Sequence, residues 1–187
     1  DDNTGQLQTG MLTKIRCPAC DHDNYKLFLN KTGFQLQSCF NCDLVFVNPR
    51  PTEAVQIDFF SQSKAMDLYS EMVEKTKVER AKLIFTPLAD KIFSEFGTEG
   101  GNLLEVGCGS GLLLEALQMR NTAWRLKGVE PNERAVEICR EKDFDVFHAS
   151  LEEVKDDNKY DLVVFWAVFD HFFDPFSIIE KSFKLLK

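Results

Sequence analysis

Apolar and polar positions follow two different rhythms along this chain. Between residues 25 and 47 they alternate with a period of two, which predicts a hairpin of strands 25–29 and 34–37 and a third strand at 44–47. From about 67 to 96 apolar residues recur every three to four positions, which predicts a helical region. Pro87 should kink or break that helix and Gly97 should end it. Covering a sheet is the expected role of the helix, and closing over a ligand is the alternative.

Beyond residue 100, short apolar runs alternate with helical stretches. Strands are expected at 103–106, 125–130, 144–148 and 161–166, and helices at 112–117, 133–142 and 176–186. This alternation indicates an α/β fold with a doubly wound parallel sheet. The last of these strands is almost continuously apolar, so we expect both of its faces to be covered.

The same patterns divide the chain into four regions. They are a polar tail at 1–13, a small module at 14–48, a linker and helical cap region at 49–98, and a half-domain at 99–187. The linker begins in the stiff sequence Asn-Pro-Arg-Pro at residues 48–51.

Composition narrows the class of protein. The 187 residues are 44% hydrophobic and 12% aromatic, which is typical of a globular chain with a core. A net charge of −8 argues against nucleic acid as the main partner. No apolar run reaches the roughly 18 residues of a membrane span, and the start has no signal-peptide pattern. We therefore expect a cytoplasmic protein, away from membranes, with reduced thiols.

Four of the six cysteines form two closely spaced pairs. Cys17, Cys20, Cys39 and Cys42 follow the pattern C-x2-C-x18-C-x2-C. Two residues between paired thiolates allow a tight turn to aim both sulfurs at one metal, so the spacing predicts a zinc ribbon. Disulfides or free core cysteines are the alternatives. Because four thiolates leave zinc no open position, we expect a structural zinc ion rather than a catalytic one.

A glycine-rich loop follows the strand at 103–106 directly. Gly107, Gly109 and Gly111 lie between that strand and the next helix, where glycines let a ligand approach the backbone and free N–H groups act as donors. Glu130 ends the second strand. In this arrangement an acid there accepts hydrogen bonds from ribose hydroxyls, the alternative being an ordinary surface acid.

The loop does not fit a dinucleotide fingerprint, because Leu112 and Leu114 occupy the positions that need a small residue. The Glu-x-Gly-x-Gly-x-Gly pattern at 105–111 instead resembles motif I of the class I S-adenosylmethionine-dependent methyltransferases. Residues 128–131, 147–153 and 160–175 are similar to later motifs of that family, and the resemblance covers about 103–187. The zinc ribbon resembles a module on some members, including methyltransferases of sugars or secondary metabolites.

The resemblance implies a set of residues that bind the cofactor S-adenosylmethionine. They are Glu105, Gly107, Cys108, Gly109, Gly111, Glu130, Pro131, Ser150, Leu151, Phe165, Trp166 and Ala167. Glu105 would support the amino group of the cofactor and Glu130 its ribose. The backbone at Ser150 and Leu151 would meet the adenine, although many relatives carry Asp where Ser150 stands. The residues at 165–167 would border the methyl group.

Two residues are candidates for proton transfer. His171 is the candidate general base, because an imidazole titrates near neutral pH, and Asp170 could orient it or hold a substrate hydroxyl. The family often has Glu-His at this place, so Asp170 shortens the reach by one methylene. A purely structural role at the end of a helix is the alternative for His171.

The resemblance predicts methyl transfer to a small-molecule acceptor, with a sugar or secondary metabolite among the candidates. One alternative is an RNA or protein methyltransferase that uses the ribbon for docking, and another is a non-catalytic scaffold that kept the cofactor pocket. The family sheet has seven strands, whereas this chain supplies four and looks truncated after the fourth strand and its helix. We therefore expect an exposed edge that allows self-association, and cofactor binding more than turnover to survive in this chain.

Overall fold

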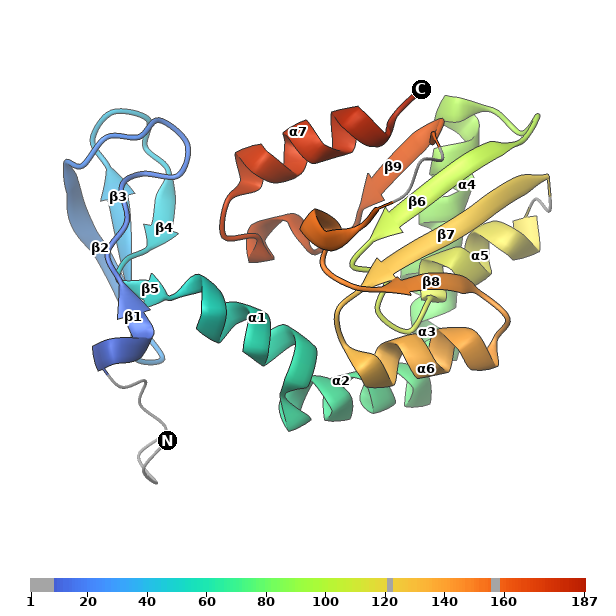
Figure 1. Cartoon of the computed structure of the whole chain (residues 1–187), viewed down its shortest axis with the longest axis horizontal. Helices are drawn as coiled ribbons and strands as arrows, with labels where there is room; N and C mark the ends of the chain where they lie inside the picture. The colour runs from blue at the N-terminus through green and yellow to red at the C-terminus, as the bar shows by residue number, and fades with distance from the viewer. Residues whose placement is uncertain (1–8, 121–122, 156–158) are drawn as a thin grey trace. The chain divides into compact units, whose positions relative to one another are not determined.

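The computed structural model describes residues 9–120, 123–155 and 159–187. Contacts divide the chain into two compact units, Asp1–Asp58 and Phe59–Lys187, and each is described by itself (Figure 1). No helix in the described ranges is both long enough and apolar enough to cross a membrane.

The first unit is built from short antiparallel strands. They are β1 (Leu12–Thr13), β2 (Tyr25–Lys31), β3 (Phe34–Cys39), β4 (Val45–Val47) and β5 (Arg50–Pro51). β2, β3 and β4 form the sheet that the alternation predicts, and β1 pairs with β5. Asn48 is buried, and its side chain exchanges two hydrogen bonds of 3.0 Å with the backbone of Ile15. The start of the predicted linker is therefore packed into this unit.

A series of helices leads into the second unit. They are α1 (Glu53–Gln62), α2 (Lys64–Lys75), α3 (Lys77–Arg80), a π-helical turn (Ala81–Phe85) and α4 (Thr86–Phe96). The helical region begins before residue 67, because Ser63 caps α2 by accepting a hydrogen bond from Met66 N–H. Pro87 lies in the first turn of α4, where its missing N–H is tolerated, and the irregular turn precedes it. Gly97 ends α4 with a φ of +85°.

The second unit contains the predicted parallel sheet. Its strands are β6 (Gly101–Val106), β7 (Trp124–Glu130), β8 (Asp145–His148) and β9 (Leu162–Phe165), in the order β8-β7-β6-β9. The connecting helices are α5 (Leu112–Arg120), α6 (Glu133–Glu141) and α7 (Pro175–Leu185), with 3-10 turns η3 (Leu151–Glu153) and η4 (Phe169–His171). The central position of β6 places the glycine-rich loop at the middle of the sheet edge.

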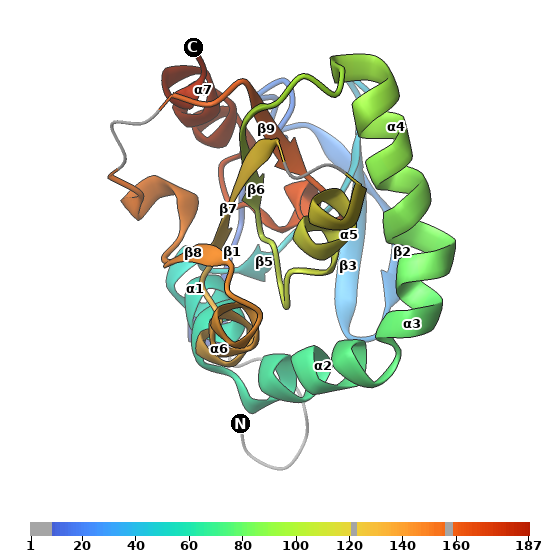
Figure 2. The ribbon, with the colours of Figure 1, turned by 90° about the vertical axis from the view of Figure 1, so that its right-hand side faces the viewer.

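Helices cover both faces of this sheet (Figure 2). On one face, Leu113 and Leu117 of α5 and Ile92 and Phe93 of α4 pack against Leu103. On the other face a second cluster joins α7 and η3 to the sheet; its buried members are Leu104, Val106, Val129, Leu151, Val154, Tyr160, Ile178 and Leu185. The apolar faces of the helices therefore pack into two core layers, one on each face of the sheet.

β9 is only partly buried, although its apolar sequence predicted complete cover. The reason is its place as the outermost strand on that side of the sheet. Beside it the last residues return to the sheet: Tyr160 N–H donates to the Leu185 carbonyl at 2.9 Å, and Lys187 N–H donates to the Tyr160 carbonyl at 3.0 Å.

Candidate functional site

The four cysteines of the first unit converge on one point. All four Sγ atoms lie within 4.8 Å of one another, and the thiols are free rather than joined in disulfides. The Sγ atoms of Cys17 and Cys42 are 3.5 Å apart, and those of Cys20 and Cys39 are 3.6 Å apart. A tetrahedron with Zn–S bonds of about 2.3 Å has sulfur–sulfur edges of about 3.8 Å. The donor set therefore fits a four-thiolate zinc ion.

Two matching turns hold these cysteines. Asp21 and Asp43 each adopt a left-handed conformation, with φ of +57° and +58°, and donate backbone hydrogen bonds to the carbonyls of Cys17 and Cys39. A hydrogen bond from Asn41, followed by one from the His22 backbone, lowers the pKa of Cys20 to about 6. The His22 ring is hydrogen-bonded to the Cys20 carbonyl, which leaves the four sulfurs as the ligand set.

The glycine-rich loop needs its glycines for two different reasons. Gly107, Gly109 and Gly111 all have positive φ, at +71°, +52° and +78°. A Cβ at Gly107 would lie 2.5 Å from Val168, and one at Gly111 would lie 3.0 Å from the sulfur of Cys139. A Cβ at Gly109 would meet nothing within 4 Å. The outer two glycines are therefore required by packing, and the middle one leaves space for a ligand.

The Cys108 side chain packs into the interior, and its thiol donates to the Gly109 carbonyl of the loop at 3.8 Å. Its side chain is buried, and its sulfur lies only 2.5 Å from the position that a Cβ on Gly128 would take. The thiol belongs to a cluster that packs α5 and α6 onto the sheet.

Glu130 lies directly under the loop. Its carboxylate is buried and accepts hydrogen bonds of 2.9 Å from Gly109 N–H and from Asn132 N–H. Burial raises the pKa of Glu130, and these two backbone hydrogen bonds oppose that rise. Each carboxylate oxygen keeps a second lone pair, so the geometry suits hydroxyl donors on a bound nucleoside.

Glu105 lies at the end of β6, before the loop. The side chain is 3% exposed, and its Oε2 has no hydrogen-bond partner within the described residues. Burial, followed by the proximity of Cys139 and Glu130, raises the pKa of Glu105 well above its usual value. A buried carboxylate oxygen without a partner is costly. A cationic amino group would relieve that cost, so Glu105 fits a ligand that carries one.

The predicted adenine side is formed by the turn after β8. Ser150 caps η3 through a capping box in which its own N–H and Oγ both donate to Glu153, at 2.9 Å and 3.0 Å. Leu151 is buried, and the Pro131 carbonyl is bonded to His148 at 3.1 Å. Because Ser150 N–H is already used, the predicted adenine contact falls to the Leu151 backbone and stays a prediction.

The predicted methyl-group side is formed by the segment after β9. Ala167 has a φ of +52°, and Trp166 and Ala167 are exposed. Asp170 and His171 lie side by side, with 3.8 Å between the carboxylate oxygen and Nε2, which is longer than a hydrogen bond. The ring of His171 is stacked on Phe60 of α1 instead, with ring centroids 4.8 Å apart.

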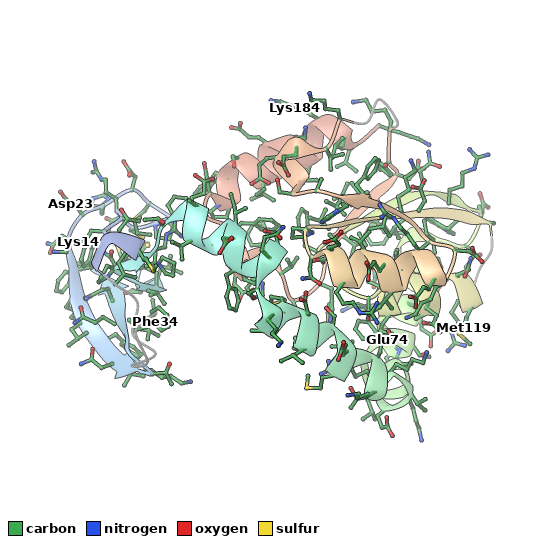
Figure 3. The ribbon with its side chains drawn as sticks, turned by 60° about the horizontal axis from the view of Figure 1, so that its bottom comes forward. Lys14, Asp23, Phe34, Glu74, Met119 and Lys184 are labelled. Carbon is green, nitrogen blue, oxygen red and sulfur yellow. The ribbon has the colours of Figure 1, made fainter. Side chains whose placement is uncertain are left out.

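Sequence reasoning missed how α2 is attached to this site. Asn132, which caps α6, also donates to Asp67 of α2 at 2.9 Å. Lys142 donates to the Ser110 carbonyl in the loop at 3.0 Å and to Glu74 at 2.8 Å. Glu74 lies on α2 and is labelled in Figure 3. These partners are separated by more than 30 positions in the sequence, so no local pattern could have indicated them.

Comparisons with known proteins agree with the geometry. A family described as "Methyltransferase domain" matches residues 78–187. A ubiquinone biosynthesis O-methyltransferase from Neisseria meningitidis is 29% identical over 103 residues, which are 47% of this chain and 40% of that protein. The chain thus spans less than half the length of this curated relative.

Solved structures with the same fold include two methyltransferases. One, from Methanococcus maripaludis and described as S-adenosyl-L-methionine-dependent, has a TM-score of 0.61 at 16% identity and covers 67% of this chain and 61% of that one. The magnesium protoporphyrin IX methyltransferase of Synechocystis, with bound SAM, has a TM-score of 0.55 at 16% identity, covering 72% and 71%. With more than half of its residues inside the family match, the chain belongs to the methyltransferase domain family and has the Rossmann-like fold of the class I S-adenosylmethionine-dependent methyltransferases.

Proposed function

We propose that this chain binds S-adenosylmethionine on the glycine-rich loop and takes part in methyl transfer to a small-molecule acceptor. The observation that carries the proposal is the buried Oε2 of Glu105, which has no partner within the described residues. Together with Glu130 it places two buried carboxylates at one glycine loop. One carboxylate suits a cationic amino group and the other suits ribose hydroxyls.

Binding and orientation are the tasks of this chain. When bound, S-adenosylmethionine supplies an electrophilic methyl group on a sulfonium. The open side of Gly109 lets the backbone approach the ligand, and Glu130 accepts hydrogen bonds from ribose hydroxyls. Glu105 accepts a hydrogen bond from the amino group, and Leu151 borders the adenine.

Proton removal is the task of His171. When a hydroxyl acceptor is methylated, the products are an ether, a neutral thioether and one proton, so the balance needs a base. His171 takes that proton, and Asp170 lies beside it, with 3.8 Å between its carboxylate oxygen and Nε2. An acceptor without an acidic proton would not need His171.

We also propose that zinc holds the first unit together and has no part in the chemistry. The support is the ligand set, since four thiolates leave no open coordination position.

Calorimetric titration of the zinc-loaded chain with S-adenosylmethionine tests the cofactor site. We expect binding on the order of micromolar and a loss of about tenfold or more in Glu130→Ala, because one hydrogen bond to a charged group contributes roughly 1.5 kcal/mol or more. Glu95→Ala removes an exposed acid of α4 and should bind like the wild type. Circular dichroism confirms that each variant is folded.

Two outcomes would count against the cofactor site. One is a folded, zinc-loaded chain that does not bind S-adenosylmethionine, which would mean that the glycine-rich loop, Glu105 and Glu130 do not form a cofactor site in this chain. The other is a Glu130→Ala variant that binds as tightly as the wild type, which would mean that Glu130 does not hold the ribose.

A further inference from the structure

The segment between β9 and α7 lies directly against the glycine-rich loop. Val168 fills the space where a Cβ on Gly107 would be, with only 2.5 Å between that position and Cγ2. Gly107 N–H in turn donates to the Val129 carbonyl at the end of β7. The aromatic residues on both sides of Val168, Trp166 and Phe169, are therefore fixed close to the candidate cofactor site.

Aromatic rings in this segment support one another. The rings of Phe165, Phe169 and Phe172 contact one another in pairs. Their centroids are 5.8, 5.9 and 6.1 Å apart, and the interplanar angles of 73° to 86° make the contacts edge-to-face. Phe165 and Phe172 pack against the core of the second unit, which anchors the group. Phe169 and Trp166 each stay 41% exposed. Edge-to-face contacts of this kind hold rings in place while leaving part of their surface free.

The end of α1 adds a ring from a distant part of the chain. Phe60 lies nearly parallel to the imidazole of His171, at an interplanar angle of 18°, and contacts Phe59 at 5.3 Å between centroids. Phe60 is half-buried, and Phe59 is 46% exposed. The stacking fixes the orientation of the His171 ring, so Phe60 is placed as a positioning residue for the candidate base.

Charge in this segment is sparse. Between residues 165 and 172 the only ionisable side chains are Asp170 and His171, and four of the eight side chains are aromatic rings when His171 is left out. A sugar or a nucleic acid would need several polar groups arranged to meet its hydroxyls or phosphates, whereas apolar walls with one or two polar groups suit a largely apolar ligand.

We propose that Trp166, Phe169, His171 and Phe60 form the acceptor site, and that the acceptor is a planar aromatic molecule carrying a hydroxyl group. The aromatic ring lies against the exposed rings, and the hydroxyl faces His171. This inference rests on the proposed function and specifies its substrate class.

The test uses nuclear magnetic resonance of the full, ¹⁵N-labelled chain. The chain contains two tryptophans, Trp124 in the core and Trp166 at the proposed site, so its two indole N–H signals separate core from site. Binding of S-adenosylhomocysteine is measured first by calorimetry. The loaded chain is then titrated with catechol, and with cis-1,2-cyclohexanediol as a saturated control of similar size.

We expect catechol to shift the Trp166 signal saturably, to leave the Trp124 signal in place, and to bind about tenfold or more tightly than the diol. Phe60→Ala should weaken catechol binding about tenfold and abolish the preference over the diol, and Phe60→Tyr should restore both. Phe183→Ala removes a phenyl ring that is 71% exposed on α7 and should change neither value. Affinity for S-adenosylhomocysteine should be the same in all of these chains.

Equal binding of catechol and the diol, or an unchanged Trp166 signal in a chain that binds S-adenosylhomocysteine, would overturn the inference while leaving the proposed function intact. Absence of S-adenosylhomocysteine binding would overturn both. If Phe60→Ala does not fold, Phe169→Ala takes its place, since Phe169 is partly exposed in the same segment. Unchanged catechol binding in that variant would equally contradict the proposal.

Discussion

In residues 1–58 the candidate metal site and the core are largely the same atoms, whereas in residues 59–187 the candidate cofactor site lies at the ends of strands whose core is elsewhere. The buried apolar cluster of the first unit consists of Cys17, Cys39 and Phe46, and two of these three are proposed ligands. The second unit has three buried clusters. In the first unit the candidate ligands are themselves part of the core, whereas in the second unit most of the core is formed by residues outside the candidate site.

Apolar burial explains the difference. Fully burying a Leu side chain stabilises a protein by about 2 kcal/mol, and several leucines of the second unit are completely buried. Among the described residues of the first unit, only Cys17, Cys39 and Phe46 are buried apolar side chains, so we expect apolar burial alone not to offset the entropy of ordering this unit. For such a module the free energy of metal binding becomes the free energy of folding.

The largest effect should come from removing a zinc ligand. Cys39 is 1% exposed, and its backbone N–H and carbonyl also hold the second turn. We expect Cys39→Ser to lose zinc and the β2-β3-β4 sheet, seen as metal content and as loss of dispersed amide signals from residues 12–51. Phe40→Ala, at an exposed neighbour, should keep one zinc ion per chain. A Cys39→Ser chain with an intact sheet would show that the first unit does not need the metal.

A core truncation in the second unit should have a smaller, graded effect. Leu113 of α5 is completely buried, and Leu113→Ala should lower the free energy of unfolding by about 3 kcal/mol. Denaturant unfolding measures this, with Met119→Ala as the control on the same helix, where the side chain is 80% exposed (Figure 3). Zinc content should not change. A change in zinc content would show that metal binding by the first unit depends on the stability of the second.

A methyl group added to the loop should cost about 2 kcal/mol of stability and weaken S-adenosylmethionine binding. Gly107→Ala places a side chain at a φ of +71° and 2.5 Å from Val168. Gly97→Ala has the same strained sign of φ, at +85°, but a Cβ there meets nothing within 4 Å. The control should therefore lose only about 1 kcal/mol and bind normally. Equal effects of both substitutions would mean that the contact with Val168 does not matter.

The smallest effect should come from the contact between α2 and the loop. Burial opposes ionisation of Glu74, but the hydrogen bond and charge of Lys142 outweigh it and lower the pKa of this carboxyl. A lowered folded-state pKa adds stability above the unfolded value of about 4.5, and this is lost as pH falls through the folded pKa. Glu74→Gln should therefore cost about 1 kcal/mol at neutral pH and less in acid.

Unfolding of Glu74→Gln and the wild type across pH 3–7 measures this difference, with Glu79→Gln, at an exposed acid of α3, as the control. Convergence of the Glu74→Gln and wild-type curves in acid supports the contact. A constant offset at every pH would contradict it.

The two sites also differ in how far the sequence could predict them. The four candidate zinc ligands form two identical short patterns, so spacing alone indicated all four, and the structure brings their sulfurs together. The glycine-rich loop and Glu130 were equally visible, because the turn after a strand and the acid ending the next strand are local features. The parallel sheet predicted from the alternation of strands and helices is confirmed, with its strands in the order β8-β7-β6-β9.

Contacts between distant segments were not predictable. Three contacts join residues more than 60 positions apart: Val168 packs on Gly107, Asn132 is hydrogen-bonded to Asp67, and Phe60 stacks on His171. Each depends on where a helix or loop lands after folding, and the residue types involved are common in many settings. The helical region before β6 shows the same limit, since its irregular turn precedes Pro87 rather than coinciding with it.

We expect residues 59–187 to bind the cofactor independently of the first unit. Calorimetric titration of the full chain with S-adenosylhomocysteine, before and after zinc is removed with a chelator, tests it most directly. We expect the two affinities to be equal within about twofold, because every residue proposed to hold the cofactor lies in the second unit. Loss of binding together with zinc, in a chain whose second unit is still folded, would contradict it.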